Sequence, residues 1–191
     1  MELVPPADSS TRLSLLTGVR AAPSTRPSPL EEEVTRLYDE LRVPVLRYLM
    51  TLGLSPPDGD EVVQEVFIAL FQHLRNGKSR KNLPGWVFRV AHNLGLKQRY
   101  AARGREAALS DASTVPFDPR PNPEEQAVSR QRQTRLLAVV RALPEQDRCC
   151  LHLRAEGLRY REIAKVLGMS LGAVSLSIHR SLARLSRADG G

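Results

Sequence analysis

The chain has 191 residues, enough for one ordinary domain or two small ones, and an aromatic content of only 5% disfavours a protein built from long β-strands. Its formal net charge of +7 predicts a polyanionic partner, either nucleic acid or an anionic membrane surface. No run approaches the roughly 20 apolar residues of a membrane-spanning helix, and the early acids Glu2 and Asp8 do not fit a secretory signal, so we expect a cytoplasmic protein without membrane insertion.

The first part of the chain combines serine, threonine and arginine with five prolines: Pro5, Pro6, Pro23, Pro27 and Pro29. This composition predicts an extended, poorly ordered arm over residues 1–29. A short apolar island from Leu13 to Val19 leaves one or two helical turns as the alternative.

Residues 30–103 have the hydrophobic pattern of three helices around one small core. Apolar residues recur at three- and four-residue steps from Glu31 to Leu52, which predicts one helix, bent at Pro44. Residues 54–59 have turn chemistry, and a second helix with a wide apolar stripe is expected from Asp60.

A polar loop over residues 76–83 follows the second predicted helix, and Pro84 is well placed to open a third one. Residues 104–123 contain several prolines and no apolar periodicity, which is typical of a flexible linker. Pro123 then restarts the helical pattern, so residues 124–191 are expected to form a second domain. The fold class is therefore all-α, with two small helical domains.

The second domain ends in a short helix, a glycine turn and a longer helix. A helix from Pro144 is expected to stop at Gly157 in a left-handed cap, followed by helices over 160–167 and 171–187. This is the helix-turn-helix arrangement. Its predicted core is Ile163, Ala164, Leu167, Val174, Ile178, Leu182 and Leu185.

The helix-turn-helix has the chemistry of a DNA-reading unit. Gly168 permits the turn, and Ser170 is able to cap the last helix and offer its N-terminus to a phosphate. The polar face of the last helix, suited to the major groove, carries Ser175, Leu176, His179, Arg180 and Arg184. A helical hairpin with a solvated basic face is the alternative reading.

Eight basic residues with no acidic residue among them extend to the start of the predicted linker: Lys78, Arg80, Lys81, Arg89, Lys97, Arg99, Arg103 and Arg105. A solvated helix face usually mixes signs, so this block favours phosphate contact. His92 and Asn93 share its polar face, whereas Trp86 is expected in the core.

The second predicted helix opens with an acidic patch: Asp60, Glu61, Gln64 and Glu65. On a basic nucleic-acid binder such a patch favours a protein partner. Compensation of the helix dipole explains it equally well from the sequence alone.

The only two cysteines, Cys149 and Cys150, are adjacent, which disfavours a bridge between them. With His152 as the sole histidine nearby, they do not form a zinc site. We expect both to be reduced apolar residues, and we expect no metal and no cofactor.

Six stretches together resemble the two conserved regions of extracytoplasmic-function sigma factors of the sigma-70 family: 60–67 (DEVVQEVF), 83–94 (LPGWVFRVAHNL), 122–125 (NPEE), 143–148 (LPEQDR), 156–164 (EGLRYREIA) and 172–174 (GAV). The resemblance covers roughly residues 31–187. It implies a bacterial transcription initiation factor that binds core RNA polymerase, directs it to promoters and helps melt the minus-ten region.

The resemblance also implies a division of labour between the two domains. The acidic patch would bind the clamp helices of the largest polymerase subunit, and the second domain would contact the flap of the second-largest subunit. An anti-sigma factor is a further candidate partner. Minus-ten recognition and melting would use Asn76, Lys78, Arg80, Lys81, Asn82, Arg89, His92, Asn93, Lys97 and Arg99.

The minus-thirty-five element would be bound by Arg159, Tyr160, Arg161, Ser170, Ser175, Leu176, His179, Arg180 and Arg184. The chain departs from the family pattern at three neighbouring positions. Ala173 stands where the family often has threonine, and Ser175 stands where it often has a basic residue. Leu176 is apolar at a position that would face the DNA bases. An unusual sequence preference follows, because one charged base contact contributes about 1–3 kcal/mol.

Two other functions are compatible with parts of the sequence. A stand-alone helix-turn-helix regulator explains the last helices but leaves the acidic patch and the basic block without a joint purpose. An enzyme acting on nucleic acid is disfavoured because the sequence has no paired carboxylates beside a basic cleft, no histidine cluster at metal spacing and no phosphate loop. We therefore expect a protein that is not an enzyme.

Overall fold

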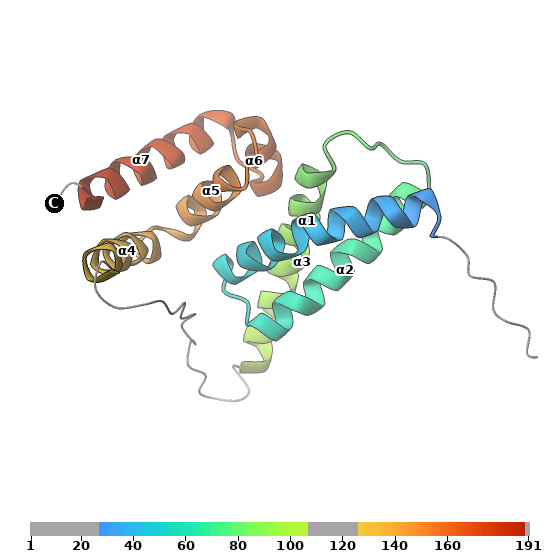
Figure 1. Cartoon of the computed structure of the whole chain (residues 1–191), viewed down its shortest axis with the longest axis horizontal. Coiled ribbons are helices and arrows are strands. Elements are labelled where there is room, and N and C mark those ends of the chain that lie inside the picture. Colours follow the sequence, from blue (N-terminus) through green and yellow to red (C-terminus); the bar gives the residue numbers. More distant parts are fainter. Residues whose placement is uncertain (1–26, 107–125, 190–191) are drawn as a thin grey trace, which may run out of the picture.

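The computed structural model describes residues 27–106 and 126–189, all of whose regular elements are α-helices. In chain order they are α1 (Pro29–Thr51), α2 (Pro56–Arg75), α3 (Leu83–Glu106), α4 (Gln126–Arg141), α5 (Glu145–Ala155), α6 (Tyr160–Leu167) and α7 (Leu171–Asp189). Figure 1 shows α1, α2 and α3 side by side in one half of the molecule and α4 to α7 in the other. The predicted all-α fold is confirmed.

Two helices begin at prolines that follow a serine cap. Ser28 and Glu31 form a reciprocal capping box, in which the Ser28 amide donates to the Glu31 carboxylate at 2.6 Å. Ser55 caps α2 through its hydroxyl, which accepts from the Asp58 amide at 3.3 Å. The predicted turn over 54–59 is therefore wrong from Pro56 onward. Prolines fit the first helical turn because amides there have no intrahelical acceptor to lose.

The core of the first half is formed by the predicted apolar stripes, in which Val45, Val66, Leu70 and Val87 are fully buried. Small residues let the helices approach one another. A Cβ added at Gly95 of α3 would lie 2.7 Å from Leu49 Cδ2 of α1. Glycine at this position therefore sets the close contact between α1 and α3.

The second half contains the predicted helix-turn-helix. Gly157 and Gly168 have φ values of +87° and +64°, in the left-handed region that favours glycine. The Ser170 hydroxyl accepts from the Ala173 amide at 3.1 Å, as expected of a cap. One core prediction is wrong: Leu182 is largely exposed, and Ser181 takes the buried position, since the inward stripe of α7 runs through Val174, Ser177 and Ile178.

The two halves pack against each other through α1 with α5 and α3 with α6, and one hydrophobic cluster is continuous across both. The predicted linker begins too early, because α3 continues to Glu106. The predicted arm (except residues 27–29), most of the linker and the predicted restart at Pro123 lie outside the described residues. Both cysteines are buried free thiols. No single described helix is long and apolar enough to cross a membrane; the bent pair α6 and α7 passes that test only jointly, with 106° between its members.

Candidate protein and nucleic-acid interfaces

The acidic patch lies on the solvent face of α2. Glu61, Gln64 and Glu65 are exposed, while Asp60 is partly buried and lies 3.5 Å from Arg42. Ile68 continues this face and is 59% exposed, which sequence reasoning missed. Its position outside the buried stripe of α2 was a signal that could have revealed it. An apolar side chain beside exposed acids is the composition of a protein-binding surface.

The loop between α2 and α3 has two exposed basic side chains and several residues that form local hydrogen bonds or ion pairs. Lys78 and Lys81 are exposed. Arg80 Nε donates to Glu33 at 3.1 Å, across to α1. Asn76 is the C-cap of α2, and Asn82, with a φ of 54°, accepts from the Gly85 amide at 3.2 Å. These contacts fix both ends of the loop.

The predicted polar face of α3 divides into an exposed stripe and a buried pair. Arg89, Asn93 and Lys97 are exposed at successive four-residue steps, so they form one stripe. Arg99 is instead only 14% exposed, bonded to the Leu52 carbonyl at 2.9 Å and to Glu145 at 2.8 Å. The predicted group is therefore not brought together as a whole.

His92 is the other α3 residue drawn inward: its Nδ1 lies 2.8 Å from the Tyr48 hydroxyl of α1. Burial lowers the pKa of His92 and outweighs the attraction of Glu145, while Arg99 lowers it further. The ring is therefore neutral at pH 7, and its Nδ1 shares a hydrogen bond with the Tyr48 hydroxyl. This places His92 at the contact between the halves and not on the exposed stripe.

The outward face of α7 carries Leu176, which is 63% exposed, with His179 and Arg184 exposed beside it. His179 Nδ1 lies 2.8 Å from the Ser175 carbonyl one turn earlier. A hollow of about 880 Å³ opens at the start of α7; its lining is Asn82, Arg159, Tyr160, Arg161, Glu162, Lys165, Leu171, Gly172 and Ser175. Three of these side chains are bases, which suits an anion such as a backbone phosphate.

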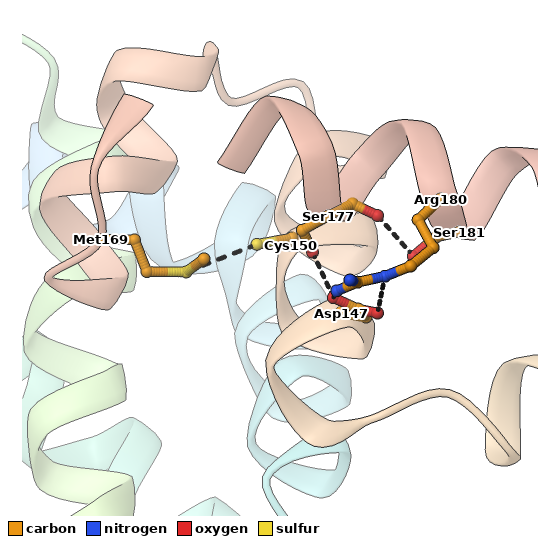
Figure 2. Close-up of polar contacts among 6 residues, drawn as sticks. All are labelled: Asp147, Cys150, Met169, Ser177, Arg180 and Ser181. Atoms are coloured by element: carbon orange, nitrogen blue, oxygen red, sulfur yellow. Dashed lines mark hydrogen bonds and ion pairs between the residues drawn. The ribbon is translucent and has the colours of Figure 1, made fainter. Parts of the chain in front are cut away.

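Arg180, whose side chain is 48% exposed, is bonded to a buried carboxylate of α5 (Figure 2). Asp147 of α5 is 1% exposed and accepts from Arg180 Nε at 3.0 Å, from Arg180 Nη2 at 2.7 Å and from the Ser177 hydroxyl at 2.7 Å. Burial raises the pKa of Asp147, but the hydrogen bonds from Arg180 and Ser177 outweigh it and hold the pKa below its usual value. Arg180 therefore joins α7 to α5, a role that the sequence did not reveal.

Comparisons with known proteins agree with this arrangement. Residues 37–105 match the family model of sigma-70 region 2, and residues 133–185 match that of sigma-70 region 4. The chain is 31% identical over 188 residues to the ECF RNA polymerase sigma factor SigE of Mycolicibacterium smegmatis, covering 95% of this chain and 69% of the relative. It is 29% identical over 137 residues to the ECF RNA polymerase sigma-E factor of Escherichia coli, covering 65% and 71%.

Solved structures show the same fold. CnrH in complex with the cytosolic domain of CnrY aligns with a TM-score of 0.53 and 24% identity, covering 82% of this chain and 86% of that one. The sigma factor RpoE of Bartonella quintana, solved with the anti-sigma factor NepR, aligns with a TM-score of 0.58 and 18% identity, covering 81% and 96%.

Proposed function

Because the chain belongs to the sigma-70 family, among its extracytoplasmic-function RNA polymerase sigma factors, and directs RNA polymerase to promoters, we propose a division of that task between its two helical halves. Residues 30–106 would form the unit for core binding and the minus-ten element, and residues 124–191 the unit for the minus-thirty-five element. The separation of charge in the first half supports this most directly: α2 presents an acidic face and α3 a basic stripe.

The acidic face of α2 would bind the clamp helices of the largest polymerase subunit. Glu61, Gln64 and Glu65 supply charge and hydrogen-bond acceptors, and Ile68 supplies an apolar contact at the end of this face. Asp60 would act through its contact with Arg42, which orients the first turn of this face.

The exposed basic side chains of the first half would hold the separated DNA strand of the minus-ten region and help melt the duplex. A basic track beside polar side chains suits single-stranded DNA, because unpaired bases are free to enter polar pockets. The track would consist of Lys78, Lys81, Arg89, Asn93 and Lys97. Asn76, Arg80 and Asn82 would shape the loop, while His92 and Arg99 would act in packing.

The outward face of α7 would read the minus-thirty-five element, with Leu176 and His179 toward base edges and Arg184 toward the backbone. Basic and hydroxyl side chains that line the hollow would contact phosphates: Arg159, Tyr160, Arg161 and Ser175. Ser170, the cap of α7, would do the same. Arg180 would contribute by fixing α7 on α5. Contact with the flap of the second-largest subunit belongs to the same half.

We further propose that the chain works in the cytoplasm, where core polymerase acts, and without catalytic residues of its own. An anti-sigma factor is a fitting regulator, because RpoE was solved in complex with the anti-sigma factor NepR. A stand-alone regulator remains the rival function, although it gives the acidic face of α2 no task.

Gel filtration with core polymerase tests the proposal. The chain is expected to co-elute with core enzyme and, by itself, to bind promoter DNA only weakly; together they should give specific, salt-sensitive initiation. A dimeric footprint on palindromic DNA without polymerase would favour the stand-alone regulator.

Exchanging Arg89 and Lys97 for glutamine should flatten the salt dependence of binding to single-stranded minus-ten DNA by the assembled holoenzyme. Each lost phosphate contact on a single strand lowers the slope of log K against log salt by about 0.7, so two lower it by about 1.4. Fluorescence anisotropy at several salt concentrations measures the slope. Glutamine at Arg36 and Arg161 is the matched control on this fragment, and an unchanged slope in the Arg89 and Lys97 variant would contradict the assignment.

A further inference from the structure

Helix α5 has two stripes that face different halves of the molecule. Asp147, Cys150 and Leu153 face their own half, where Asp147 contacts α7 and Cys150 Sγ lies 3.8 Å from Met169 Sδ (Figure 2). The second stripe follows steps of four, three and four residues, so it forms one continuous line on the helix. Its members are Glu145, Cys149, His152 and Glu156.

Every member of the second stripe meets α1 or α3. Glu145 Oε1 lies 2.8 Å from Arg99 Nη1, and Glu156 Oε1 lies 3.3 Å from Arg47 Nη2. Cys149 is buried beside the Tyr48 hydroxyl, and this burial raises its pKa to about 12, so the thiol stays protonated. The second stripe therefore has a complementary receptor in the first half.

Two histidines flank Tyr48 at the centre of this contact. Tyr48 is 0% exposed; its hydroxyl bonds His92, and its ring centroid lies 5.6 Å from that of His152. The Thr51 hydroxyl donates to the Arg47 carbonyl at 3.0 Å and lies 3.4 Å from His152 Nδ1, so it is able to accept from that nitrogen. His152 Nε2 is buried, makes no hydrogen bond within the described residues and lies 3.5 Å from Glu156 Oε1.

The charged neighbours of His152 come from both helices. Burial lowers the pKa of His152, and Arg47 lowers it further. Glu156, 3.5 Å away on α5, and a hydrogen bond with the Pro44 backbone of α1 both raise the pKa, but burial outweighs them. The neighbours of His92 are Tyr48, Glu145 and Arg99, described above. Both rings are therefore neutral while the halves are in contact, and each becomes free to take up a proton when they separate.

The same contact conflicts with the proposed promoter-bound state. Helix α6 packs on α3, and Asn82 shares a hollow with Arg159 and Lys165. The minus-ten and minus-thirty-five elements lie about 25 base pairs apart, roughly 85 Å of duplex. Two halves in direct contact do not reach both elements, whereas the 19 residues between Glu106 and Gln126 span up to about 65 Å when extended, which permits separation.

We propose that the second stripe of α5 is an intramolecular latch that holds the free chain closed, and that protonation of His92 and His152 releases it. The inference rests on the proposed function, since only an open chain spans both promoter elements. The sign follows from neutral rings in the closed state: closure is fully stable above the usual imidazole pKa of about 6.5 and weakens as pH falls below it.

Single-molecule energy transfer between dyes on unnatural amino acids at Arg36 and Ala183, both exposed, tests the latch in the free full-length chain. The closed-to-open ratio should fall up to about 100-fold between pH 7.5 and 5.5, about tenfold for each imidazole. His152→Gln should reduce that response to about tenfold. Tyr48→Phe keeps the ring but removes the hydroxyl that contacts Cys149 of α5, so it should lower the ratio at pH 7.5. His179→Gln is the control with an exposed histidine.

A ratio that does not change with pH, a wild-type response in His152→Gln, or helix loss by circular dichroism before any change in transfer would each overturn the latch. Promoter-dependent initiation at pH 7.5 separates this result from the proposed function. Initiation that persists while the transfer results fail removes the latch alone. A pH-dependent latch in a chain that never supports initiation removes the promoter role.

Discussion

Replacing Glu61 and Glu65 with lysine is expected to weaken the binding of core RNA polymerase at least about 100-fold, because each reversal loses an attractive contact and adds a repulsive one, about 1.4 kcal/mol or more per site. Both side chains are exposed on α2, so the free energy of unfolding should change little. Titration of labelled core enzyme with the variant measures the affinity.

The matched control for this variant is Asp39→Lys with Glu40→Lys. These acids are exposed on α1, so the same change in net charge falls outside the proposed surface. The control should bind core enzyme within about twofold of wild type at physiological salt. An equal loss in both variants would assign the effect to net charge and not to the acidic face of α2.

Asp147→Ala should lower the free energy of unfolding by about 2–3 kcal/mol at pH 7, the largest stability effect that we expect from a polar residue here. The change removes a buried carboxylate with three hydrogen bonds and leaves the buried Ser177 hydroxyl without its acceptor. Urea denaturation followed by circular dichroism measures it. Ser177→Ala, which removes one donor and keeps the Arg180 pair, should cost only about 1 kcal/mol.

The pH dependence of this difference reports on the Asp147–Arg180 pair. The pKa of Asp147 is depressed in the folded chain, so its contribution is complete above the usual carboxyl pKa and disappears as pH falls through the folded value. The gap between wild type and Asp147→Ala should therefore close in acid. In Arg180→Met the burial that raises the pKa of Asp147 remains, while the arginine that lowers this pKa is gone. The pKa of Asp147 should then lie above its usual value, so this variant should lose stability as pH rises above about 4. A gap independent of pH would show that folding leaves the pKa of Asp147 unchanged, and a gap that narrows as pH rises would show that folding raises it.

Sequence patterns predicted the helices well where local chemistry alone decides them. The apolar stripe of α2 and the glycines at 157 and 168 lie where periodicity and turn chemistry place them. The start of α2 was missed because Pro56 and Pro57 resemble a turn in sequence, yet fit a first helical turn after the Ser55 cap.

The roles of individual site residues were harder to predict because they depend on tertiary packing. Asp147 reads as an ordinary acid in the first turn of a helix, and only the approach of α7 reveals it as the buried partner of Arg180. Arg99 and His92 belong to the basic block by sequence, but α1 and α5 cover them. The contact made by the second stripe of α5 could not be predicted from the sequence. Cys149 and His152 have no distinctive pattern in the sequence, and their role follows only from the position of Tyr48 between them and α3.

Run-off transcription on genomic fragments with purified core polymerase tests the central claim most directly. With the full-length chain added, we expect discrete transcripts whose start sites share one pair of upstream motifs, and no such transcripts from core enzyme alone. The Glu61→Lys, Glu65→Lys variant should give none. Transcripts that are the same with and without the chain, in the presence of active core enzyme, would contradict the account.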